Sequence, residues 1–170
     1  MHAATAPGLL SEHICLSCHQ TFMTPHVCSL CNNRLCSENC ETSPDHLKEC
    51  SYFRRLLPSL SGQEQKSANR NVLNLMLPFR LLRLRFENPE KWKLLMELES
   101  HMEERKNTPV WNLIENTIAP HLKIMFANEW EDLDTSTVQK ICGIIDVNSF
   151  GRLFYVQICI HQLINLYFIW

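Results

Sequence analysis

The stretch from Cys15 to Cys50 constrains this chain more than any other part of its sequence. Seven cysteines and one histidine fall into four close pairs within 36 residues. The pairs are Cys15-x2-Cys18, Cys28-x2-Cys31, Cys36-x3-Cys40 and His46-x3-Cys50. Zinc takes four sulfur or nitrogen ligands in tetrahedral geometry, so eight ligands predict two closed structural sites holding two Zn²⁺ ions. Two tight-turn pairs followed by two pairs at helical spacing favour an interleaved, cross-braced arrangement.

A disulfide framework is the alternative explanation for a cluster of cysteines. The paired set contains an odd number of thiols together with a histidine, which suits zinc better. The first residues have neither the basic region nor the long apolar run of a secretory signal peptide, so an oxidising compartment is not indicated. His13, His19 and His26 lie among the ligands but break the paired spacing, and we expect them to be surface residues.

Composition predicts a mainly α-helical chain with a small two-zinc finger. The 170 residues include only 4 glycines and many leucines, which favours helices over a turn-rich β architecture. A net charge of −2 gives no general attraction to nucleic acid or to an anionic membrane. Residues 13–50 carry two basic and four acidic residues, a net charge of −2, so we expect no direct DNA binding.

Local signals place several helices after the cysteines. A helix is expected from Asp45 to about Leu56, capped by Ser43, and a polar linker is expected over residues 58–63. An apolar helix follows over Asn71–Phe86, which Pro78 either kinks or divides into two.

The remaining helices are marked by start and stop residues. Asn88-Pro89 begins a helix that is expected to reach about Lys106, and Thr108-Pro109 begins another that runs to about Trp130 with a break at Pro120. The run Asp134-Thr135-Ser136-Thr137 is expected to cap a short last helix, which Gly143 would end.

The order and spacing of the four ligand pairs resemble a MYND-type zinc finger at all eight positions. The resemblance implies that the first and third pairs share one zinc, and that the second and fourth pairs share the other. The implied ligand sets are Cys15, Cys18, Cys36 and Cys40 for one ion, and Cys28, Cys31, His46 and Cys50 for the other. Fingers of this family bind short Pro-rich peptides, often in transcriptional regulation, so the resemblance implies a protein partner of this kind.

Two later segments resemble proteins of the SET and MYND domain family, in particular its arthropod branch. The first consists of two stretches of the Leu-rich helical region, residues 77–84 and 98–105, and the second is residues 141–150, with the sequence ICGIIDVNSF. Members of the family are S-adenosylmethionine-dependent protein lysine methyltransferases with a split SET domain. Asn148 matches an asparagine that contacts the cofactor, and no catalytic residue can be carried over.

The chain also departs from that family, because neither the glycine-rich cofactor loop nor the Asn-His-Ser-Cys motif is present. We therefore expect an incomplete or inactive relative that acts as an interaction module; the alternative is an active histone or protein lysine methyltransferase. The expected organisation is a leader (1–12), the finger (13–50), a helical insert (51–140), the start of the return to the SET core (141–151) and an apolar tail (152–170). We expect a monomer of the nucleus or cytoplasm, not inserted in a membrane, since the tail carries several polar residues.

Overall fold

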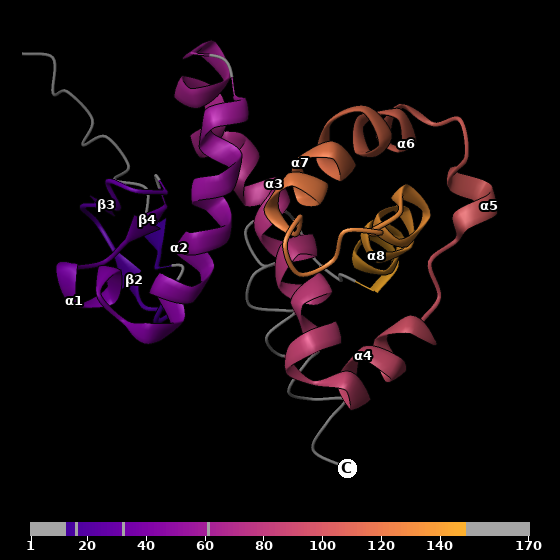
Figure 1. Cartoon of the computed structure of the whole chain (residues 1–170), viewed down its shortest axis with the longest axis horizontal. Coiled ribbons are helices and arrows are strands. Elements are labelled where there is room, and N and C mark those ends of the chain that lie inside the picture. Colours follow the sequence, from indigo (N-terminus) through magenta and orange to yellow (C-terminus); the bar gives the residue numbers. More distant parts are fainter. Residues whose placement is uncertain (1–12, 16, 32, 61, 149–170) are drawn as a thin grey trace, which may run out of the picture. The chain divides into compact units, whose positions relative to one another are not determined.

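The structure is a computed structural model of the whole chain, and it describes residues 13–15, 17–31, 33–60 and 62–148 (Figure 1). The chain divides into two compact units, residues 1–69 and residues 70–170, which are described separately below. Helices account for most of the described residues, and the strands are only two residues long. The prediction of a mainly α-helical chain is therefore confirmed. The domain boundaries expected from the sequence stay a prediction.

Two short hairpins begin the first unit and are built alike. In the first, β1 (His13–Ile14) pairs antiparallel with β2 (Thr21–Phe22), and in the second β3 (His26–Val27) pairs with β4 (Arg34–Leu35). The registers are equivalent, because the pairs His13–Phe22 and His26–Leu35 differ by 13 positions on both strands. A Cys-x2-Cys turn occupies the same place in each hairpin, so the first two ligand pairs lie on a repeated structural element.

The last two ligand pairs of the first unit lie on or beside helices. Helix α1 (Glu38–Glu41) is a single turn, whereas α2 (Pro44–Leu56) has 13 residues and is followed by the 3₁₀ turn η1 (Leu57–Ser59). Ser43 caps α2 as predicted, since its hydroxyl accepts a hydrogen bond from the backbone N–H of His46. The sequence prediction for α2 is confirmed to within one residue at its start.

Helix α3 (Gly62–Glu87) is a single helix across the position of Pro78. The boundary between the two units falls within α3. Of the two alternatives expected at Pro78, a kink or a division into two helices, the division is therefore wrong. A polar linker over residues 58–63 is also not found, because η1 and the start of α3 occupy most of that segment.

Helix α4 (Pro89–Met96) begins as predicted but ends ten residues early. Its start is capped by Asn88, whose side chain accepts from the backbone N–H of Lys91 at 3.0 Å. Beyond the helix, the carboxylate of Glu99 accepts from the backbone N–H groups of Ser100 and His101. These bonds replace the helical ones, and His101 has a left-handed φ of 46°. The single turn α5 (Met102–Arg105) then follows.

The sequence predicts a break at Pro120 in the next helix, but the helix is not broken there. Helix α6 (Pro109–Leu113) continues through the π-helical segment η2 (Ile114–Ile118) into α7 (Ala119–Met125). In the π segment the backbone N–H of Ala119 bonds to the carbonyl of Ile114, five residues earlier. The wider turn gives the Pro120 ring room beside the preceding carbonyl groups, which explains how the helix passes through this residue.

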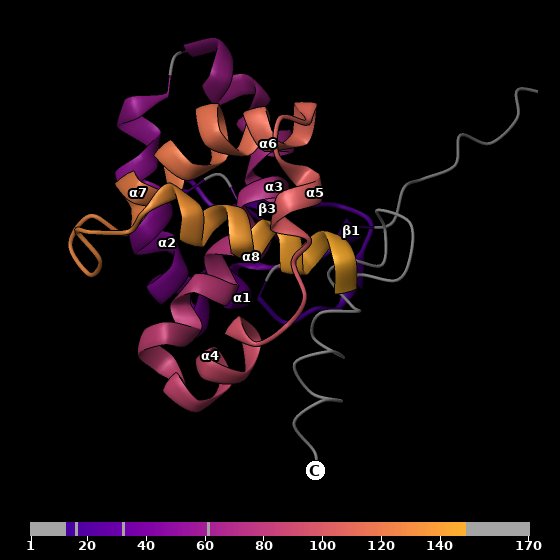
Figure 2. The ribbon, with the colours of Figure 1, turned by 90° about the vertical axis from the view of Figure 1, so that its right-hand side faces the viewer.

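Helix α8 (Thr135–Asn148) lies at the centre of the second unit. Figures 1 and 2 show it enclosed by α4, α5, α6 and α7, and it contacts α5, η2 and α7. The backbone N–H of Thr137 donates to the carboxylate of Asp134, which confirms this residue as the cap. Gly143 does not end the helix, because α8 continues for five residues beyond it. Val138, Ile141 and Ile144 of α8 are buried, and so are Ile114 of η2 and Leu122 and Met125 of α7, the segments that α8 contacts.

Among the described residues, no helix is both long enough and apolar enough to cross a membrane. The sequence analysis considered membrane insertion for the apolar tail over residues 152–170. This tail lies outside the described residues.

Candidate metal centre

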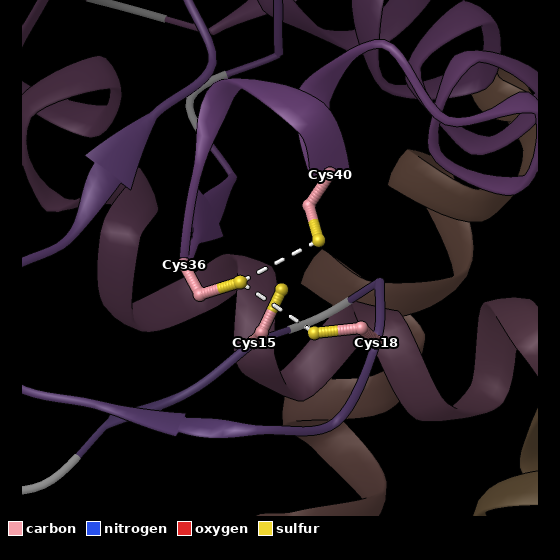
Figure 3. Close-up of side chains that lie close together, drawn as sticks. All are labelled: Cys15, Cys18, Cys36 and Cys40. Atoms are coloured by element: carbon pink, nitrogen blue, oxygen red, sulfur yellow. Dashed lines mark hydrogen bonds between the residues drawn. The ribbon is translucent and has the colours of Figure 1, made fainter.

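The first four thiols named from the sequence come together as a cluster, here called site 1. Cys15, Cys18, Cys36 and Cys40 direct their sulfur atoms toward one another (Figure 3). The Sγ of Cys36 lies 3.5 Å from the Sγ atoms of both Cys18 and Cys40. Cys15 is fully buried, Cys18 is exposed, and the other two are half-buried. Site 1 therefore has one side open to solvent.

The other four predicted ligands form site 2, which is enclosed. Cys28, Cys31, His46 and Cys50 are all buried. The Sγ atoms of Cys28 and Cys50 are 3.9 Å apart, and Cys31 Sγ is 3.8 Å from Nε2 of His46. The structure thus assembles the eight residues into the two sets that the MYND resemblance implies.

The spacing of these atoms fits a tetrahedral zinc ion. A Zn–S bond of about 2.3 Å gives an S···S edge of about 3.8 Å in a regular tetrahedron. Within each site all four donor atoms lie within 4.8 Å of one another, and the closest pairs are 3.5–3.9 Å apart. A disulfide requires sulfurs about 2 Å apart, and the described cysteines are all free thiols. Each cluster could therefore hold one zinc ion.

Each site takes two ligands from a hairpin turn and two from a later segment. In the first turn, the N–H of Cys15 donates to the carbonyl of Gln20 at 2.9 Å; in the second, the N–H of Cys28 donates to that of Asn33 at 2.9 Å. The first turn also places His19 in the left-handed region, with a φ of 61°. In the folded chain, these backbone bonds close each turn around its two cysteines.

The helical ligand pairs are held by serine caps. Ser37 caps α1, accepting from the N–H of Cys40, and its hydroxyl lies 3.7 Å from the sulfur of Cys36. Ser43 caps α2, on which His46 and Cys50 lie four positions apart and therefore share a face. Both caps thus lie next to ligands and fix where the ligand-bearing helices begin.

Backbone amides and burial act in opposite directions on the thiols of site 1. Burial alone would raise the pKa of Cys15, but the backbone N–H groups of Cys18, Ser17 and Cys36 outweigh it and lower that pKa to about 7. Burial and the neighbouring thiols Cys36 and Cys18 raise the pKa of Cys40 to about 12. The amides stabilise one thiolate, while close thiols oppose the ionisation of others, so a cation is the natural counterpart of this cluster.

Burial controls the chemistry of site 2. It raises the pKa of Cys31, with further increases from Cys50 and Cys28, and it also raises the pKa of Cys50. The pKa of the His46 imidazole is lowered by burial, which favours the neutral ring that coordinates a metal. Three thiols and one neutral imidazole complete a zinc tetrahedron, so site 2 requires no further ligand.

Some residues around the sites were missed by sequence reasoning. Nε2 of His26 bonds to the carboxylate of Glu41, which lowers the pKa of that carboxyl group. The hydroxyls of Ser17 and Ser43 are 2.9 Å apart. The hairpins themselves could have been found, because His-Ile-Cys-x2-Cys at residue 13 recurs as His-Val-Cys-x2-Cys at residue 26. No sequence signal identifies the Ser17–Ser43 contact, since it joins residues far apart in the chain.

Asn148, the cofactor contact implied by the family, is the last residue of α8. Its side-chain nitrogen donates to the carbonyls of Glu99 at 3.1 Å and Ile144 at 2.8 Å. It therefore has a structural role in joining the end of α8 to the segment before α5.

A curated protein of Drosophila melanogaster, the SET domain-containing protein SmydA-8, isoform A, is 36% identical to this chain over 80 residues. The match covers 45% of this chain and 16% of that protein. No protein-family model and no solved structure matches the chain. The chain is thus a distant relative of a SET domain-containing protein and spans a small part of its length.

Proposed function

We propose that residues 13–50 form a MYND-type finger with two structural zinc ions that serves as a protein-interaction module. The observation that carries this proposal is the sorting of eight donors into two tetrahedral clusters, each with two ligands from a hairpin turn and two from a later segment. When bound, zinc supplies folding free energy by cross-linking segments that bury little apolar surface of their own. Cys15, Cys18, Cys36 and Cys40 would hold one ion, and Cys28, Cys31, His46 and Cys50 the other.

The surface of the first unit supports the binding of a peptide with apolar character. Four large apolar side chains there are close to half exposed: Met23, Val27, Leu30 and Leu47. Val27 and Leu30 lie on the second hairpin, beside buried zinc-site cysteines, so a bound peptide would contact a surface that the metal keeps rigid. A short Pro-rich peptide loses little conformational entropy on binding such a surface. We therefore propose a Pro-rich partner segment as the ligand.

A nuclear magnetic resonance titration of the zinc-loaded chain with Pro-rich peptides tests this function. We expect shifts confined to the first unit, and a loss of affinity of about tenfold in Leu30→Ser, since about 1.4 kcal/mol is the size of effect expected when an anchoring residue of an interface is replaced. Val110→Ser is the matched control, because Val110 is 50% exposed but lies in the second unit. Shifts that are absent across the peptide panel, or equal losses in both variants, would remove the support for peptide binding.

The second candidate is S-adenosylmethionine-dependent protein lysine methylation by a longer protein of which this chain is a part. The name of the Drosophila relative, a SET domain-containing protein, favours it. Under this proposal the finger and helices support a catalytic domain. Calorimetric titration with S-adenosylmethionine tests whether this chain contributes a cofactor site: saturable binding would favour the enzyme, whereas no binding would mean that any cofactor site lies outside this chain.

A further inference from the structure

The two sites are joined by a hydrogen-bonded pair of serines, Ser43 in the turn between α1 and α2 and Ser17 in the first hairpin turn. The hydroxyl of Ser43 donates to the carbonyl of Cys40, a site 1 ligand, at 2.8 Å. It also accepts from the backbone N–H of His46, a site 2 ligand, at 3.3 Å. One side chain therefore contacts the backbone of a ligand from each site.

Ser17 extends this link to the first hairpin. It lies between Cys15 and Cys18 in the site 1 turn, and its hydroxyl is 2.9 Å from that of Ser43. A hydroxyl has one proton to donate, and Ser43 gives its proton to Cys40, so Ser17 is the donor between the two serines. The turn that carries half of site 1 is thus bonded to the cap of the helix that carries half of site 2.

Glu41 makes a second connection between site 1 and site 2. It follows Cys40 directly, and its carboxylate bonds to the ring of His26 in β3, the strand that leads into the second hairpin turn. The segment that supplies the last ligand of site 1 therefore also holds the second hairpin turn, which supplies two ligands of site 2.

We propose that Ser17 and Ser43 are positioning residues that couple the two zinc sites, so that occupancy of one site raises the affinity of the other. This inference rests on the zinc-binding function proposed above. Binding at site 1 fixes the first turn and Cys40, which holds Ser43 in its capping position. Ser43 then holds the start of α2, and with it His46 and Cys50, where site 2 requires them. The coupling acts equally in both directions, because it is a free energy shared between two binding events.

Native mass spectrometry of the reduced, metal-free chain with one equivalent of zinc tests the coupling. We expect the metal-free and two-zinc species to dominate, whereas independent equal sites would give about half of the molecules one zinc ion. In Ser17→Ala the one-zinc species should increase, with the coupling reduced about fivefold by the loss of one partly buried hydrogen bond. Two equivalents should still fill both sites in this variant.

Ser51→Ala is the matched control, since the hydroxyl of Ser51 bonds only to the carbonyl of Lys48 within α2. This variant should behave like the parent chain. A dominant one-zinc species in the parent chain, or an unchanged distribution in Ser17→Ala, would overturn the coupling while leaving zinc binding intact. Failure of the parent chain to bind any zinc would instead remove the proposed function itself.

Discussion

Gly143 shows how one residue fixes the packing of the second unit. A Cβ built at this position would lie 2.3 Å from the carbonyl oxygen of Ser100 and 2.8 Å from the guanidinium of Arg105. The nearest obstacle is backbone, which cannot rotate away. The close approach of α8 to the segment before α5 therefore requires glycine, although glycine inside a helix ordinarily reduces its stability.

We predict that Gly143→Ala lowers the free energy of unfolding of the second unit by about 2–3 kcal/mol, despite the better helix propensity of alanine. The tryptophans among the described residues, Trp92, Trp111 and Trp130, all lie in this unit, so their fluorescence in a urea titration follows its unfolding. Ser136→Ala, at an exposed position of the same helix, should change the stability by less than about 0.5 kcal/mol. A stabilised Gly143→Ala variant would show that the close contact does not exist.

The success of sequence reasoning also differs from residue to residue. The caps Ser43, Asn88, Thr108 and Asp134 were predicted, because a cap bonds to an amide three residues away and its signal is local. Gly143 was misread as a helix stop, because its neighbour Ser100 is 43 positions away and cannot be seen in a local pattern. The eight metal ligands were found from their spacing, but their division between the sites came from the family resemblance.

At the scale of elements, Arg105 joins the short helix α5 to α8. One guanidinium nitrogen donates to the carbonyl of Gln139 at 3.1 Å, and another to the carboxylate of Asp146 at 2.6 Å. The arginine side chain is only 12% exposed, whereas that of Asp146 is 52% exposed. The bond to the carbonyl is therefore shielded, and the ion pair is partly screened by solvent.

We predict that Arg105→Ala destabilises the second unit by about 1–2 kcal/mol, because the carbonyl of Gln139 loses its charged donor. The urea titration that follows tryptophan fluorescence measures this loss of stability. Lys106→Ala is the control: the amine of Lys106 pairs with Glu103 on the exposed surface, and its loss should cost less than about 0.5 kcal/mol. Equal effects of the two substitutions would mean that the bridge to α8 contributes nothing.

The elements that sequence reasoning misjudged are those that depend on tertiary structure. Helix α4 ends at Met96 because Glu99 binds the following backbone amides, and this segment packs against α8. The helix continues through Pro120 because the wider turn of the π-helical segment η2 lies just before this residue. Local sequence signals identify the starts of the capped helices α2, α4, α6 and α8, whereas the end of a helix depends on its tertiary contacts.

At the scale of the whole molecule, the chain combines a metal-dependent unit with a unit that has an apolar core. The second unit buries large side chains including Phe79, Leu122 and Phe126. The first unit relies on a few apolar residues, chiefly Leu35, Phe53 and Leu56, together with two clusters of donors. Zinc is thus expected to be essential for the fold of the first unit alone.

Zinc K-edge X-ray absorption on the purified chain, with the metal quantified in the same sample, is the experiment to perform first. Two zinc ions per chain are expected, with seven sulfur donors for every nitrogen donor across the two sites and Zn–S distances of about 2.3 Å. A folded chain that contains no zinc, or zinc bound mainly by oxygen, would show that these clusters are not the structural metal sites proposed.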